Sequence, residues 1–135
     1  MKFSNVFLVI CFAILSYFSS FGQDKFNTCS AIFVEDSRLV DEYSPRGKCI
    51  IDASAKGTLT VREIIGDDDF RQDVFVPFKV AIKEGKTNTL TLFSGNSYKK
   101  LDIQSVLKKC NKGDRVLVLP EGEKWSLPHH EVLVE

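Results

Sequence analysis

Cys110 and the pair His129–His130 are the residue types from which a nucleophilic site could be built. A cysteine nucleophile needs a base within reach of its proton, and Asn111 could orient that base. Cys110 follows an apolar run that we expect to be helical, and the carboxyl end of a helix disfavours a thiolate. We therefore interpret Cys110 as a buried thiol and predict that the protein is not an enzyme. A small cysteine-dependent enzyme is the less favoured alternative.

Two other groups have the residue types of metal sites without the required spacing. Asp67, Asp68 and Asp69 are consecutive, whereas a calcium loop needs acidic residues at alternate positions and a later glutamate. His129 and His130 are adjacent, so on a strand their side chains point to opposite faces. We predict no metal and no cofactor. The loop from Gly66 to Asp73 suggests another alternative, a secreted inhibitor-like binding protein that uses this loop.

A basic cluster and one proline are the candidate contact surface. The cluster surrounds the end of the expected helix and comprises Lys108, Lys109, Lys112 and Arg115. It could meet an acidic partner, peptidoglycan or lipid head groups, and a solvated surface is the alternative. The whole chain has 18 basic and 18 acidic residues, without the basic excess of a nucleic-acid-binding protein. We expect a protein partner and no nucleic acid.

The first 22 residues have the features of a secretory signal peptide. Lys2 supplies the positive start, residues 6–18 are almost wholly apolar, and Ser20 and Gly22 are the small residues before the cut. We predict cleavage between Gly22 and Gln23 and export to the periplasm or the cell exterior. The apolar run is shorter than the ~20 residues of a membrane span. The remaining 113 of the 135 residues, 23–135, suffice for a single domain without a transmembrane segment.

Three cysteines remain in residues 23–135, and an oxidising compartment would allow one disulfide bond. Cys29 and Cys49 are the nearest pair in sequence, and each stands at the start of an apolar run. Their bond would close a loop of about 20 residues and stabilise the fold by ~3 kcal/mol. Three buried free thiols, Cys110 among them, are the alternative.

Alternating apolar residues predict β-strands separated by turn-rich segments. Strands are expected at residues 30–35, 49–53, 57–65, 74–83, 89–93, 116–119 and 131–135. The clearest strand is 74–83, where the residues sharing one face are Val74, Val76, Phe78, Val80 and Ile82. Pro77 cannot donate a ladder hydrogen bond, so it predicts an edge strand or a bulge. An exposed edge at Pro77 or at the last strand would suit partner binding.

One short helix is predicted over about Leu101–Cys110. Its apolar residues recur with helical spacing, at Ile103, Val106, Leu107 and Cys110. Asp102 can cap its first turn. Gly113 can adopt the left-handed geometry that closes a helix.

Residues 58–134 also contain motifs that resemble a known family. These are FVPFKV at 75–80, SVLKKCNKGDRV at 105–116, and Leu127–Pro128 before the last strand. They resemble the carboxy-terminal domain of GldM, the periplasmic shaft of the type IX secretion and gliding-motility machine of Bacteroidetes. The resemblance implies an immunoglobulin-like β-sandwich that works by contact and has no catalytic residues. GldM also has a transmembrane helix and further domains, so its drive-shaft role does not carry over.

Taken together, the residues predict a mainly β protein, an antiparallel immunoglobulin-like sandwich with one short helix. We expect a non-catalytic, exported or envelope-associated interaction module. Its partner and its oligomeric state do not follow from the residues.

Overall fold

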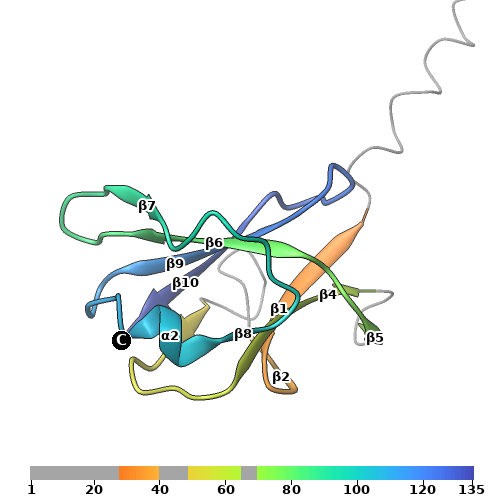
Figure 1. The fold of residues 1–135 in the computed structure, drawn as a ribbon, viewed down its shortest axis with the longest axis horizontal. Coiled ribbons are helices and arrows are strands. Elements are labelled where there is room, and N and C mark those ends of the chain that lie inside the picture. The colour runs from red at the N-terminus through yellow and green to blue at the C-terminus, as the bar shows by residue number, and fades with distance from the viewer. Residues whose placement is uncertain (1–27, 40–48, 65–69) are drawn as a thin grey trace, which may run out of the picture.

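Two five-stranded sheets are formed by the residues that the structure, a computed structural model, describes: 28–39, 49–64 and 70–135 (Figure 1). The first sheet has the order β2 (Ser37–Arg38), β1 (Cys29–Val34), β4 (Thr58–Ile64) and β5 (Phe70–Phe75), and β8 (Leu101–Asp102) also pairs with β4. The second has the order β3 (Ile50–Ile51), β10 (His130–Val134), β9 (Arg115–Pro120), β6 (Phe78–Lys83) and β7 (Leu90–Leu92). The predicted mainly β class is confirmed.

Strand pairing is antiparallel with one exception among the described strands. β3 runs parallel to β10, with Ile50 opposite Leu133 and Ile51 opposite Val134. This pairing places β10 between β3 and β9, inside its sheet. The prediction that the last strand could offer an exposed edge is therefore wrong.

The core lies between the two sheets, where the apolar phase of each strand faces the other layer. β1 and β4 contribute Ile32, Leu59 and Val61, and the second sheet contributes chiefly valines and Phe78, all almost fully buried. Trp125 closes one end of this core. Its indole Nε1 donates to the carbonyl oxygen of Glu121 at 2.8 Å, as a buried indole N–H requires.

The stretch expected as one strand over 74–83 is divided between the two sheets. β5 ends at Phe75 in the first sheet, and β6 begins at Phe78 in the second. Pro77 lies at this crossing, outside both strands, so its missing N–H leaves no gap in either hydrogen-bond ladder. Its carbonyl oxygen accepts from Glu121 N at 2.8 Å. The predicted edge strand is therefore only half present, because β5 before Pro77 stands at the end of the first sheet, whereas β6 after it is flanked by β9 and β7. The apolar phase continues through the crossing, although Val74 is 45% exposed.

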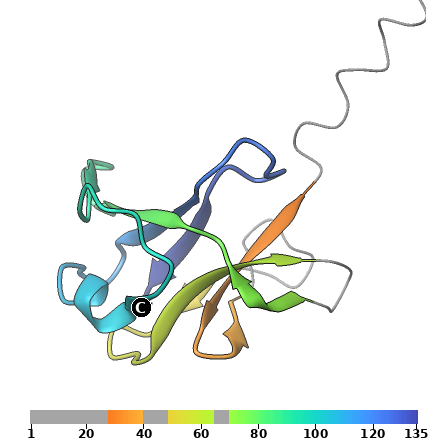
Figure 2. The same ribbon diagram turned by 45° about the vertical axis from the view of Figure 1, so that its right-hand side comes forward.

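The short helix α2 spans Ile103–Leu107, less than the predicted 101–110. Leu101 and Asp102 belong to β8 instead, and Asp102 caps the helix by accepting from Gln104 N at 3.1 Å. Ile103, Val106 and Leu107 form the buried face of α2. The helix lies at one end of the two sheets and closes the space between them (Figure 2). Gly113, at φ +92°, belongs to the turn before β9 and not to the helix cap.

Several predictions fall outside the described residues. These are the signal peptide over 1–22 and the acidic residues Asp67, Asp68 and Asp69. Within the described ranges, no helix combines the length and the apolar character needed to cross a membrane.

Candidate functional site

Among the described strands, β7 pairs only with β6, so this arm of the β6–β7 hairpin forms an open edge of the second sheet (Figure 1). Hydrogen bonds from Phe93 N to Val80 O and from Glu84 N to Thr89 O fix the ladder. Antiparallel strands alternate hydrogen-bonded and open pairs. Leu90 and Leu92 therefore direct their backbone N–H and C=O groups away from β6, toward the open edge.

The side chains of β7 make its two faces unlike each other. Leu90 and Leu92 are 59% and 61% exposed, the most exposed large apolar residues among those described. They share the outer face of the sheet with their partners Lys83 and Ala81. Thr91, between them, lies on the other face, which is hollowed, and Leu92 also reaches the rim of that hollow.

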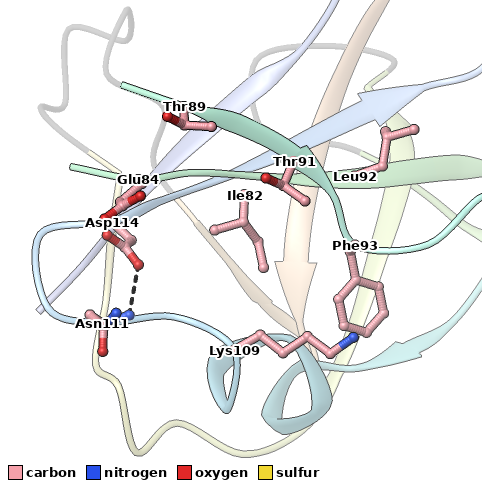
Figure 3. A pocket seen from close by; sticks show the side chains of 9 residues that line it. All are labelled: Ile82, Glu84, Thr89, Thr91, Leu92, Phe93, Lys109, Asn111 and Asp114. Carbon is pink, nitrogen blue, oxygen red and sulfur yellow. Dashed lines mark hydrogen bonds between the residues drawn. The ribbon is translucent and has the colours of Figure 1, made fainter. Parts of the chain in front are cut away.

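That hollow is a groove of about 400 Å³ between the hairpin and the segment after α2 (Figure 3). The hairpin contributes Ile82, Glu84, Thr89, Thr91, Leu92 and Phe93, and the facing segment contributes Lys109, Asn111 and Asp114. A second hollow of about 290 Å³ continues it past Gly85, Lys86, Lys112 and Gly113. The two share Glu84, Asn111 and Asp114, so they form one furrow beside the β7 edge.

Asp114 fixes the shape of this furrow. Its side chain is buried, and its carboxylate accepts from Gly85 N at 3.0 Å and from Asn111 N at 2.7 Å. The backbone hydrogen bonds from Asn111 and Gly85 hold the pKa of Asp114 below its ordinary value. A Cβ on Gly85 would overlap the carbonyl oxygen of Gly113, so only glycine allows the two loops this close.

Lysines make the rim of the furrow basic. Lys109 Nζ lies 4.6 Å from the centroid of the Phe93 ring, and Lys86 and Lys112, which line the second hollow, are exposed. Among the described residues, none of these three lysines forms an ion pair within 4.0 Å. Glu84 and Asp114 also line the furrow, so its three lysines face two carboxylates.

The predicted contact residues are only partly brought together. Lys109 and Lys112 line the furrow, whereas Lys108 is not among its lining residues. Arg115 starts β9 on the opposite face, where it bonds Glu131 at 2.9 Å. Pro77 lies at the crossing between the sheets, away from the β7 edge.

The structure contains no bond between Cys29 and Cys49, the predicted disulfide pair. Cys29 is exposed at the start of β1, whereas Cys49 is buried before β3, in the other sheet. Cys110 is partly buried against the core, and its thiol donates to Val106 O at 3.4 Å. Burial, and secondarily the charge of Asp114, raise the pKa of the Cys110 thiol to about 11.

Neither histidine makes a described contact with Cys110. His130 Nε2 lies 2.9 Å from Ser30 Oγ, and His129 Nε2 lies 3.5 Å from Glu131. The described residues contain no cluster of three or more histidine, cysteine, aspartate or glutamate side chains suited to a metal. These contacts do not assemble a nucleophile and base around Cys110.

Sequence reasoning missed the β7 edge and the furrow. The alternation of Leu90 and Leu92 was visible, but it does not tell which face is buried. The furrow joins residues 84–86 to 109–114 through a contact that no local pattern signals.

Comparison with protein-family models, curated proteins and solved structures finds no match for the chain.

Proposed function

We propose that this protein is a non-catalytic interaction module, exported from the cell, that binds an extended segment of a partner protein along β7. Strand addition of this kind uses backbone hydrogen bonds for affinity and side-chain contacts for specificity. The observation that carries the proposal is the open edge at Leu90 and Leu92. Native proteins usually cover or charge such an apolar edge.

The two faces of β7 define the partner segment. Along an added strand, alternate side chains would meet the exposed leucines and the lysine-rimmed furrow in turn. The complementary segment is therefore extended, with apolar residues alternating with acidic ones. The four backbone groups of Leu90 and Leu92 would contribute roughly 2–6 kcal/mol, at the usual net value per hydrogen bond.

Export and the GldM-like contact role remain part of this proposal. The signal-peptide features of residues 1–22 support an envelope or extracellular site of action. The motifs at 75–80 and 105–116 support a domain that works by contact.

Leu92→Pro tests the proposal directly. The N–H of Leu92 points to the open edge, so proline removes an edge donor without removing a bond to β6. Leu92→Thr is the matched control, because it shortens the side chain but keeps the N–H. A photoreactive residue at position 90, applied to envelopes of the source cell, would identify the partner segment, and Val74 is the exposed control position.

For a synthetic peptide of the cross-linked segment, we expect Leu92→Pro to weaken binding at least tenfold and Leu92→Thr to weaken it less. Lys109→Glu should also weaken binding, and added salt should reduce the difference. Binding of Leu92→Pro with wild-type affinity would refute strand addition. Concentration-dependent dimerisation through the same edge would instead show that the occupant is a second copy.

A further inference from the structure

The sequence of β7 is symmetric about Thr91. Leu90 and Leu92 stand on either side of it and expose their side chains, whereas Thr91 lines the furrow. β7 lies at the margin of the second sheet (Figure 1). The strand could therefore pair with the same strand of a second copy, antiparallel, about a two-fold axis at Thr91. A two-fold contact requires a self-complementary surface of this kind.

Backbone geometry selects this register. With the axis at Thr91, Leu90 of each copy lies opposite Leu92 of the other. Both are hydrogen-bonded pairs, so all the open backbone groups of the two leucines are used. An axis at Leu90 would place Leu92 opposite Asn88, which leaves the strand at φ +56°. An axis at Leu92 would place Leu90 opposite Ser94, beyond the end of β7.

The side chains of β7 also match in this register. On the outer face, Leu90 would lie beside Leu92 of the second copy and cover side chains that are 59% and 61% exposed. On the furrow face, Thr91 would meet its own counterpart, and cross-strand threonine pairs are favourable. Residues 89–93 include no charged side chain. Like charges therefore do not meet at the axis.

Charges beside the strand are complementary across the axis. Thr89 would lie opposite Phe93 of the second copy. Glu84 N donates to Thr89 O at 2.9 Å, and Lys109 Nζ lies 4.6 Å from the Phe93 ring centroid. All four residues line the furrow, so the two furrows would join and bring Glu84 of one copy toward Lys109 of the other. Among the described residues, neither side chain forms an ion pair within 4.0 Å.

The size of the contact indicates a weak dimer. The paired strands contribute about five residues per copy, whereas a stable interface has ~20–30 residues on each side. A contact of this size can cover an apolar edge at high local concentration and still release it to another strand.

We propose that β7 of the free protein pairs with β7 of a second copy, antiparallel about Thr91, in a weak dimer that covers the edge. A partner segment must then displace the second copy before it binds. This displacement rests on the function proposed above, whereas the pairing itself does not.

Cross-linking at the axis tests the pairing. In a Cys29→Ser background, which removes the exposed thiol, Thr91→Cys creates an open antiparallel pair with Cα atoms ~4.5 Å apart, within disulfide range. Thr89→Cys is the matched control, because this exposed residue would face Phe93 of the second copy and not itself. With oxidised glutathione as the oxidant, we expect the Thr91→Cys dimer to form at least about tenfold faster than the Thr89→Cys dimer. Equal rates for the two variants would overturn the dimer.

Exchanging the charges tests the second contact of the dimer. Glu84→Lys should slow cross-linking through Thr91→Cys, and adding Lys109→Glu to it should restore the rate, because the pair is then reversed and not lost. Failure of the double variant to regain the rate would overturn the Glu84–Lys109 contact. The same double variant should still bind the partner peptide more weakly than the wild type.

The partner peptide, identified by cross-linking from position 90, separates this inference from the proposed function. The peptide should slow cross-linking through Thr91→Cys, and a rate that it leaves unchanged would overturn the displacement. Peptide binding without self-cross-linking would overturn the dimer and support the proposed function. Self-cross-linking without peptide binding would support the dimer and overturn the proposed function.

Discussion

Removing the Asp114 carboxylate is the sharpest test of how the furrow is held. In Asp114→Ala, the amides of Gly85 and Asn111 lose acceptors that lie at 3.0 and 2.7 Å. Hydrogen bonds to an ionised acceptor contribute ~1.5–3 kcal/mol each, and water at the furrow replaces part of that. We expect a loss of about 2–4 kcal/mol in the free energy of unfolding, a large share of the ~5–15 kcal/mol typical of a domain.

Urea denaturation at pH 7 measures this loss. With a slope of about 1–1.5 kcal/mol per molar for a small domain, the midpoint should fall by about 2 M. Glu123→Ala is the control, because Glu123 is exposed and has no hydrogen bond or ion pair among the described residues. Its midpoint should stay close to that of the wild type.

The pH dependence of the free energy of unfolding provides a second test of the same hydrogen bonds. The pKa of Asp114 is lower in the folded protein than its ordinary value of 3.8. Its contribution is therefore complete above that value and is lost as the pH falls through the lower folded pKa. The difference between wild type and Asp114→Asn should shrink below about pH 4. A midpoint unchanged by Asp114→Ala, with the Gly85 and Asn111 amide resonances unmoved, would refute the role of this carboxylate.

Two further predictions concern α2 and the turn after it. Because burial raises the pKa of Cys110 to about 11, its thiol should react slowly with iodoacetamide at pH 8. Peptide mapping should find exposed Cys29 labelled in the native protein and Cys110 labelled only after denaturation. Rapid labelling of Cys110 in the native protein would contradict its burial. Asp102→Ala removes the cap that accepts from Gln104 N and should lower the free energy of unfolding by about 1 kcal/mol. Asp102→Asn, which keeps a side-chain acceptor, should retain most of the wild-type stability. Equal stability of wild type and Asp102→Ala in urea denaturation would exclude a capping role.

The strand pattern was predictable because burial repeats every second residue whatever sheet a strand joins. Val76, Phe78 and Val80 keep one phase across Pro77, since both sheets bury their side chains in the same core. For the same reason the sequence did not indicate the crossing, because a segment that changes sheets while keeping the alternation of buried residues has the sequence pattern of one continuous strand. The parallel pairing of β3 with β10 was equally invisible, as it joins segments about 80 residues apart.

The candidate sites were less predictable, for a different reason. Cys110 could be assigned to the core from its helical spacing, even though α2 itself ends at Leu107. Leu92, however, alternates like any other strand residue, and its exposure depends on neighbours distant in the chain. Only the fold shows that no other described strand pairs with the outer edge of β7.

The crossing at Pro77 also bears on how the molecule resists force and folds. The chain passes between the layers there and again around β8 and α2, so neither layer is made of one continuous stretch of chain. One layer cannot peel away while the other stays intact, and tension on either is transmitted covalently to both. Such interleaving makes unfolding all-or-none and makes folding wait for distant segments to meet, which places the expected rate in the millisecond-to-second range of β-sandwiches.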